Sequence, residues 1–300
     1  MRRCLLIWLL CLPLLAYADH LFEAGVRLGV SGWSSQPIYV GKQAGLHVGG
    51  QLYYAYLSSH VVGVRTGLTF DRHNAGFAKS NYQDGYSTID VEGERMDIDY
   101  TIGRLTERTT MWSVGVPLQL ALARKNIYFL VGPKVVFPIS NHWTETANHA
   151  ALSVYYPAHD NRIYESYPLA ASRDFQMTNS GSLQLEKVQW WIAAELNYIL
   201  PLNRWADHYR SYLIIGAYFD YCFSKYTPTH SSAESLIMLT DTRDGFPLQR
   251  MLTPVMNGTR QGRELVSDCT LFDVGIKISY AISPYDAHRK TNSCHCLEDR

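Results

Sequence analysis

Hydrophobic and polar residues alternate with a period of two along eight stretches of about ten residues each. In the last stretch, Phe272, Val274 and Ile276 fall on one face. Asp273 and Lys277 fall on the other face. Alternation of this kind predicts β-strands with one apolar and one polar face. The eight predicted strands are Phe22–Val30, Leu46–Tyr56, Val61–Phe70, Met111–Leu122, Ile127–Phe137, Val188–Leu200, Tyr212–Ser224 and Leu271–Ile282.

The connections between these strands alternate in length. The short ones lie near residues 58–60, 123–126 and 201–210, and the long ones span Ser31–Gly45, Asp71–Thr110, Pro138–Lys187 and Lys225–Thr270. Within the second long connection, Ser87–Val91 and Met96–Ile102 flank a Glu-Gly-Glu sequence and predict a hairpin that extends strands three and four. An even number of strands with alternately short and long connections is typical of outer-membrane β-barrels, whose long loops are extracellular.

Charged residues are confined to one face of the strands. The apolar faces of all eight segments carry no charge, whereas the opposite faces carry Glu23, Arg27, Arg65, Lys134, Glu195, Asp220, Asp273 and Lys277. A soluble β-sandwich would turn these charged faces to water. A small transmembrane barrel would turn them inward and expose the apolar faces to lipid. The period alone fits both architectures.

Aromatic residues gather at both ends of the apolar faces. The predicted inner girdle is Phe22, Tyr54, Tyr56, Phe129, Tyr198 and Tyr280, and the predicted outer girdle is Phe70, Trp112, Phe137, Trp190, Phe223 and Phe272. Aromatic rings favour the two interfaces between membrane and water, whereas a sandwich core has no reason to place them at both ends. We therefore predict an all-β fold: an eight-stranded antiparallel up-and-down transmembrane β-barrel with short periplasmic turns and long extracellular loops.

The N-terminus has the pattern of an export signal. Arg2 and Arg3 precede a short apolar stretch, Leu5–Leu15, and Ala16-Tyr17-Ala18 fits a signal-peptidase site. We expect residues 1–18 to be a signal peptide, residues 19–283 the outer-membrane barrel, and residues 284–300 a periplasmic C-terminal tail. The expected location is therefore the bacterial outer membrane.

Composition excludes two broad classes of protein. The formal net charge is zero, which argues against a nucleic-acid partner. A mean hydropathy of −0.14 argues against a bundle of membrane-spanning helices. The 21 tyrosines and 21 glycines are instead typical of a chain that is rich in sheet.

The polar faces predict a filled lumen, because an eight-stranded barrel encloses little more than its own side chains. Four acids and four bases point inward in this interpretation, and we expect them to neutralise one another in a plugged or very narrow lumen. If Arg27 lies opposite Asp273 where the first and last strands meet, the same register places Glu23 opposite Lys277. We predict that this register closes the barrel.

The mature chain keeps an even number of cysteines, which permits disulfides in an exported protein. Cys222 and Cys269 both fall at inward-facing positions, near the outer ends of neighbouring strands. We therefore predict a disulfide between them. The alternative is two small buried thiols that never bond. Cys294 and Cys296 are too few to form a zinc site in the tail alone.

Two prolines, Pro117 and Pro133, lie within predicted strands, where each removes a hydrogen bond of the ladder. We expect a β-bulge at each proline, or a position whose amide would have pointed away from the ladder.

The stretches 114–120 (VGVPLQL) and 128–133 (YFLVGP) resemble the Pro-Leu and Gly-Pro strands of the PorT-like family of small outer-membrane β-barrel proteins. Residues 24–30 and 45–70 resemble the first three strands of that family. The resemblance implies the barrel fold and makes prolines expected at these two positions. The family includes one protein that is tied to secretion across the outer membrane.

Catalytic and metal-binding patterns are weak. His230, Ser232 and Glu234 could supply a hydrolase-like triad in the fourth long loop, but their loose spacing outside any clear strand favours a polar loop instead. His47 faces inward, where we expect a lumen hydrogen bond and not a ligand role. The histidines of the third loop, His142, His149 and His159, are too scattered to define a metal site. We predict no catalytic, cofactor-binding or metal-binding residues.

These observations predict a non-enzymatic integral outer-membrane barrel. Its expected partners are outer-membrane lipid and an extracellular ligand, with loops acting in surface binding, adhesion or envelope structure. The alternatives are a component of an outer-membrane protein secretion machine and a lipid-acting enzyme. We expect a monomer.

Overall fold

A computed structural model describes residues 18–58, 61–89, 93–163, 172–183, 185–202, 209–226, 235–240, 249–260 and 262–284. The predicted signal peptide, apart from Ala18, lies outside the described residues. The predicted tail lies outside them as well, apart from Pro284, and so do Cys294 and Cys296. Within the described part of the chain, no helix is long and apolar enough to cross a membrane.

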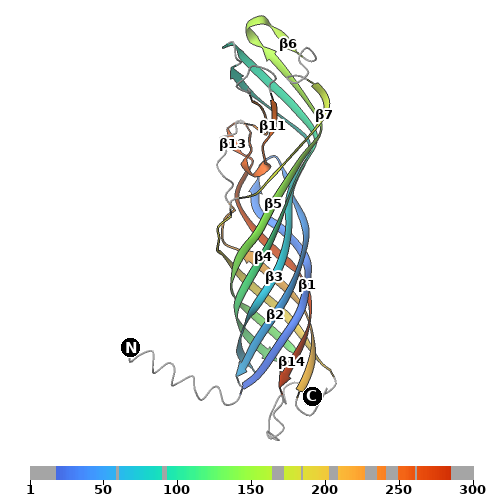
Figure 1. The fold of residues 1–300 in the computed structure, drawn as a ribbon, viewed down its shortest axis with the longest axis vertical. Coiled ribbons are helices and arrows are strands. Elements are labelled where there is room, and N and C mark those ends of the chain that lie inside the picture. Colours follow the sequence, from blue (N-terminus) through green and yellow to red (C-terminus); the bar gives the residue numbers. More distant parts are fainter. Residues whose placement is uncertain are drawn as a thin grey trace, which may run out of the picture.

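Eight antiparallel strands form a closed ring (Figure 1). The strands are β1 (Ala18–Pro37), β2 (Gly41–Ser58), β3 (Val62–Ile89), β4 (Arg95–Arg124), β5 (Ile127–Tyr156), β8 (Gln189–Pro201), β9 (Tyr209–Cys222) and β14 (Val266–Pro284). Each strand pairs with its neighbour along the chain, and pairing of β1 with β14 closes the ring. The predicted up-and-down eight-stranded barrel is confirmed.

Three strands are much longer than the alternation predicts. β3 has 28 residues, and β4 and β5 have 30 each. The predicted loops over residues 71–110 and 138–187 are therefore largely strand, and the β3–β4 ladder continues to the pair Ile89 and Arg95. The predicted hairpin that extends strands three and four is confirmed. We call residues 75–110 of β3 and β4, together with residues 141–156 of β5, the extension, and the barrel end that carries it the outer end (Figure 1).

The extension has its own apolar core. Phe77, Ile98, Ile102 and Val154 are almost fully buried there. Short elements complete this part of the fold: η2 (Pro157–His159), β6 (Asn161–Ile163), β7 (Ser172–Gly181), β10 (Ile237–Thr240), β11 (Gln249–Leu252), η3 (Val255–Asn257), β12 (Thr259–Arg260) and β13 (Arg263–Glu264). Because buried residues from the fourth predicted loop join the same core, that loop is folded over the barrel mouth in its described parts.

The polarity of the two-residue pattern inverts along β3 and β4. In the barrel, buried positions are charged or polar, as at Arg65, and exposed positions are apolar, as at Leu68. In the extension, buried positions are apolar, as at Ile98, and Asp99 and Arg104 are exposed. The surroundings of the sheet therefore change between the barrel and the extension.

The prolines interrupt the ladder without shifting it. Pairs are missing between Thr66–Leu118 and Thr69–Gly115, but the register is the same on both sides of the gap at Pro117. Pro133 remains paired with Ile192 of β8. The expected bulges at the prolines are thus wrong, because no extra residue is inserted. The other expectation, an amide that would have pointed away from the ladder, stays a prediction.

Candidate functional site

The barrel interior holds charged side chains in two groups, and the first we call the inner quartet: Glu23, Arg65, Glu195 and Lys277. Lys277 Nζ lies 2.8 Å from Glu23 Oε1 and 2.6 Å from Glu195 Oε2. Arg65 bridges the same two acids, with Nη1 3.1 Å from Glu23 Oε2 and Nη2 in contact with Glu195. All four side chains are at most 1% exposed. Two acids and two bases form a closed, charge-neutral set.

The second group, the outer quartet, consists of Arg27, Asp71, Lys134 and Asp220. Lys134 Nζ lies 2.9 Å from Asp71 Oδ2 and 3.0 Å from Asp220 Oδ2. Arg27 reaches the same two acids, at 2.7 Å from Asp220 and 3.4 Å from Asp71. This group is also neutral and almost completely buried.

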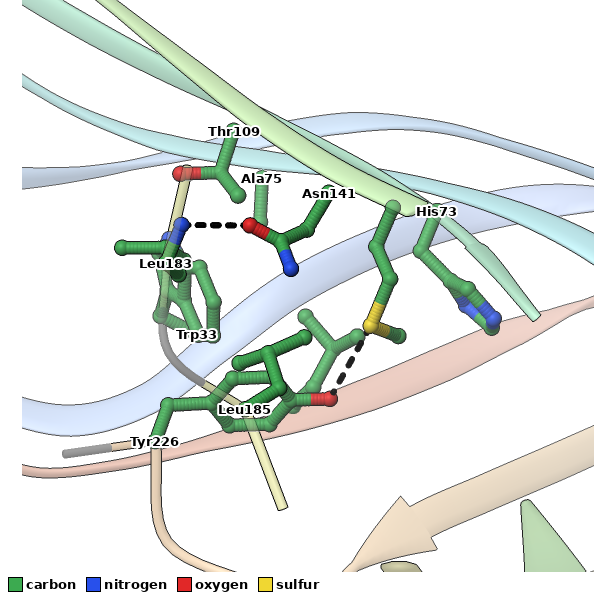
Figure 2. Close-up of a pocket in the computed structure, with 10 residues that line it drawn as sticks. Trp33, His73, Ala75, Thr109, Asn141, Leu183, Leu185 and Tyr226 are labelled. Carbon is green, nitrogen blue, oxygen red and sulfur yellow. Dashed lines mark hydrogen bonds between the residues drawn. The ribbon is translucent and has the colours of Figure 1, made fainter. Parts of the chain in front are cut away.

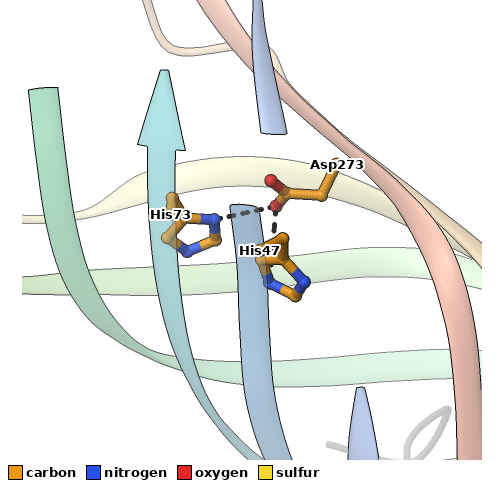
Figure 3. Close-up of side chains that lie close together, drawn as sticks. All are labelled: His47, His73 and Asp273. Atoms are coloured by element: carbon orange, nitrogen blue, oxygen red, sulfur yellow. Dashed lines mark ion pairs between the residues drawn. The ribbon is translucent and has the colours of Figure 1, made fainter. Parts of the chain in front are cut away.

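Asp273, the eighth charged residue of the predicted lumen, belongs to neither quartet. In the described part of the chain, its ion-pair partners are His73 and His47 (Figure 3). Asp273 Oδ2 lies 2.9 Å from His73 Nδ1 and 3.9 Å from His47 Nε2. These three residues come from β14, β3 and β2, and all three are buried.

The predicted closing register is wrong. Arg27 lies opposite Lys277, and Asp273 lies opposite Ser31. Glu23 lies opposite Ala281, yet it still contacts Lys277. The prediction failed because it required ion pairs between directly opposed residues. Lysine and arginine side chains span several residues along a strand, so they pair diagonally and across the lumen.

Tyr218 packs between the outer quartet and the histidines. The Arg27 guanidinium lies 3.9 Å from the Tyr218 ring centre, and the Tyr218 hydroxyl lies 2.5 Å from His47 Nδ1. The expected lumen hydrogen bond of His47 is therefore present. Gly29 and Gly275 oppose each other beside this ring, and a Cβ on either would lie within 2.7 Å of the hydroxyl. Both positions must lack a side chain for Tyr218 to fit.

Sequence reasoning missed Asp71 and His73. Arg65 and Thr69 point into the lumen, and Asp71 and His73 continue the same alternate positions of the strand. Extending the alternation beyond Phe70 would therefore have predicted that both point inward. The predicted strand ended at Phe70 because the following residues are polar on both faces.

The predicted disulfide is absent, and Cys222 and Cys269 are buried thiols. Tyr221 lies opposite Phe272, which places Cys222 level with Leu271, two residues from Cys269. Such diagonal neighbours are about 7–8 Å apart. That separation exceeds the range of Cα distances that a disulfide normally bridges.

The predicted girdle residues all lie on the outer face of the barrel, where each is exposed or half-buried. Ring contacts link members within each group: the ring centres are 5.2 Å apart for Phe22 and Tyr54, and also for Phe70 and Trp112. Arg72 follows next along β3, exposed, with its guanidinium 5.6 Å from the Trp112 ring. Charge on the outer face of β3 therefore begins immediately beyond the outer girdle.

Two carboxyl groups face each other inside the extension. Glu107 of β4 lies opposite Glu145 of β5, and both side chains are fully buried. Burial raises the pKa of Glu107 to about 7, against the opposing effect of the backbone amides of Val255 and Met256. Burial and the neighbouring Glu107 raise the pKa of Glu145 well above its usual value.

Among the described residues, the histidines of the third predicted loop do not assemble into one site. His230, Ser232 and Glu234 lie outside the described residues. His149 contacts Asp174, His159 contacts Glu94, and His142 is exposed on β5.

A small cavity borders His73 on the outer side of the lumen (Figure 2). It has room for about one water molecule. Its walls are Trp33, His73, Ala75, Thr109, Met111, Asn141, Leu183, Leu185, Tyr226 and Leu271. The cavity therefore lies between His73 and residues of the apolar core, such as Trp33 and Met111.

No protein-family model matches the chain, and no curated protein matches it. Among solved structures it is similar to Ail, the attachment invasion locus protein of Yersinia pestis, in complex with the heparin analogue sucrose octasulfate, at 10% identity and a TM-score of 0.30. That match covers 88% of this chain and 99% of Ail. Neisserial surface protein A matches at 9% identity over 90% of this chain and 99% of its own, with a TM-score of 0.29. CarO2 of Acinetobacter baumannii matches at 13% identity over 85% and 99%, with a TM-score of 0.24. The resemblance to the PorT-like family stays a prediction.

Replacing Lys277 tests the inner quartet. In Lys277→Met, Glu23 and Glu195 share only Arg65, so an uncompensated buried charge remains. We expect the free energy of unfolding to fall by about 3–5 kcal/mol. Urea unfolding of the folded chain in detergent micelles measures it. The control is Lys187→Met, at an exposed position, and an equal loss in both variants would contradict the assignment.

The glutamate pair predicts a pH dependence in the extension. Because the folded-state pKa of Glu107 is raised to about 7, folding favours its protonated form, and stability falls as the pH rises from about 4.5 to 7. Above that range the full penalty of a buried charge is present. We expect thermal unfolding at pH 8 to occur several degrees lower than at pH 5. The variant Glu107→Gln/Glu145→Gln should lose most of this difference, and an unchanged pH profile in it would contradict the assignment.

Proposed function

We propose that the chain is an integral outer-membrane barrel with a closed lumen, and that its extension acts on the cell surface in binding, adhesion or envelope structure. The observation that carries this proposal is the inversion of polarity along β3 and β4. A sheet whose exposed positions are apolar in one half and charged in the other half fits two surroundings, hydrocarbon and water.

The limits of the apolar region support the same interpretation. The outer faces of the barrel strands carry large exposed aliphatic side chains, including Val26, which is 63% exposed, and Ile276, which is 58% exposed. The two aromatic girdles lie at the ends of this apolar region. Arg72 lies just beyond the outer girdle, where it would contact anionic lipid headgroups. A water-soluble protein rarely leaves so continuous an apolar surface uncovered.

The lumen supports a non-porin function. The two quartets fill the middle of the barrel, and a second apolar cluster that includes Leu21, Tyr128 and Ile214 fills the inner end. The side chains within an eight-stranded barrel leave little room for solutes. The interior thus holds the structure together, and the surface function falls to the extension.

The extension suits recognition because its core holds its surface in place. Its core residues come from β3, β4, β5 and the described parts of the fourth loop. A body of this kind presents fixed side chains to a partner, which lowers the entropy cost of binding. The partner would be met on the extracellular side, away from the short turns of the inner end.

Arginine substitutions test where the lipid lies. Val26→Arg places a charge in the middle of the apolar region. Ile139→Arg places one at the outer girdle, level with Trp112. The two positions are similarly exposed, at 63% and 61%. We expect Val26→Arg to cost about 2–4 kcal/mol in lipid bilayers and Ile139→Arg about 0–1 kcal/mol. Unfolding in bilayers measures both. Equal costs in the two variants would contradict the proposed position of the lipid.

Cysteine labelling of intact cells tests the orientation. Ile89→Cys lies at the tip of the β3–β4 extension, and Arg124→Cys lies at the turn that joins β4 to β5. A membrane-impermeant maleimide should label Ile89→Cys in intact cells, and Arg124→Cys only after the outer membrane is permeabilised. The reverse pattern would contradict the proposed orientation.

The binding role is tested separately. Cells that carry the chain and cells that lack it can be compared for adherence to immobilised glycans and proteins, with envelope integrity measured in parallel by detergent sensitivity. The proposal predicts a difference in adherence or in integrity, and no difference in either would contradict it.

A further inference from the structure

We propose that His47, His73 and Asp273 bind a divalent transition-metal ion, with Zn²⁺ as its representative, at the outer end of the barrel lumen. The site joins β2, β3 and β14, and it goes beyond the surface role of the extension. Two imidazoles and one carboxylate are a common ligand set for such ions.

The geometry fits a single ion. Three candidate ligand atoms, one from each residue, all lie within 4.8 Å of one another (Figure 3). Asp273 Oδ2 lies 2.9 Å from His73 Nδ1 and 3.9 Å from His47 Nε2. Ligands held about 2.0–2.1 Å from a tetrahedral zinc ion are roughly 3.4 Å apart. The observed separations lie on both sides of that value, so small side-chain rotations suffice.

The three atoms that face one another form ion pairs. His47 Nε2, His73 Nδ1 and Asp273 Oδ2 are buried, and their polar contacts are the ion pairs with one another and, for His47, with Asp71. These three atoms lie within 4.8 Å of one another, so one ion could contact all of them.

The opposite side of each ligand is held in place by a hydroxyl group. Tyr218 lies 2.5 Å from His47 Nδ1, and Ser113 Oγ lies 2.9 Å from His73 Nε2. Ser31 donates a hydrogen bond to Asp273 Oδ1. Outer-shell hydrogen bonds of this kind fix the tautomer and orientation of metal-binding histidines. Each ligand therefore has one atom anchored and one atom available.

The charge balance of the lumen points to a cation at this place. The inner and outer quartets each pair two acids with two bases, so they are neutral without Asp273. In the described part of the chain, Asp273 has histidines in place of arginine or lysine as its ion-pair partners. A divalent ion on neutral imidazoles would neutralise Asp273 and leave one positive charge beside Asp71 of the outer quartet, whose Oδ1 lies 3.4 Å from His47 Nε2.

A fourth ligand is available. Asp71 Oδ1 lies 3.4 Å from His47 Nε2, close enough to join the coordination sphere. The small cavity beside His73, which has room for about one water molecule, could instead supply a water ligand (Figure 2).

The competing explanation is a proton. A protonated His73 paired with Asp273 would also balance the charge, and it would bind no metal. The two explanations differ in a direct measurement, because only the metal site gives saturable binding of Zn²⁺ and a visible absorption spectrum with Co²⁺.

The test uses the full mature chain, folded in detergent, without a polyhistidine tag and stripped with a chelator. Zn²⁺ is titrated by calorimetry, and thermal unfolding is followed with and without Zn²⁺. We expect one equivalent to bind, a rise in the unfolding temperature, and a four- or five-coordinate Co²⁺ spectrum. His47→Gln and His73→Gln should each lose at least 10-fold in affinity. Ser113→Ala, which leaves all three ligands in place, should lose about 10- to 100-fold.

The control is His149→Gln, an exposed histidine on the extension, which should bind Zn²⁺ like the unaltered chain. Heat-modifiable migration on gels shows whether each variant is folded. Two results would overturn the proposal: no saturable binding of either ion by the folded chain, or equal binding by His47→Gln, His73→Gln and the control.

Discussion

Ion pairing inside a narrow closed barrel is the interaction on which the rest of this structure depends. Arg27, Arg65, Lys134 and Lys277 are cut off from water, and each has two carboxylate partners. A buried charge without a partner would cost several kcal/mol, so the strands can close only in a register that completes both quartets. Gly29 and Gly275 serve the same constraint, because they leave space for the ring of Tyr218.

The same two-residue period has opposite meanings in the two halves of β3 and β4. In the barrel the apolar face is outside, and charged groups satisfy one another within. In the extension the apolar face is inside, and the charged groups meet water. One continuous sheet can therefore join a membrane barrel to a water-exposed body without a linker. Glu107 and Glu145 depart from this rule as acids in an apolar interior, and their raised pKa values are the consequence.

The sequence was sufficient to predict the eight strands and the residues on each face, because strand alternation depends only on local spacing. It was insufficient to predict the register between neighbouring strands, which sets the height of each residue along the barrel axis. Cys222 and Cys269 share a face but lie two residues apart in register, so no disulfide forms. Arg27 and Asp273 share the lumen, yet Arg27 pairs with Asp71 and Asp220 instead. Asp71 and His73 were missed because the predicted strand ended where its outer face became polar. The histidine cluster thus emerges only from the fold.

The most direct test of the ion-paired, closed interior is electrical recording from the purified chain in planar bilayers, after flotation with lipid vesicles has shown that it inserts. The quartets and the apolar cluster at the inner end predict a silent protein, with at most small and brief current steps. Large, stable, porin-like conductance from an inserted and folded chain would contradict the account.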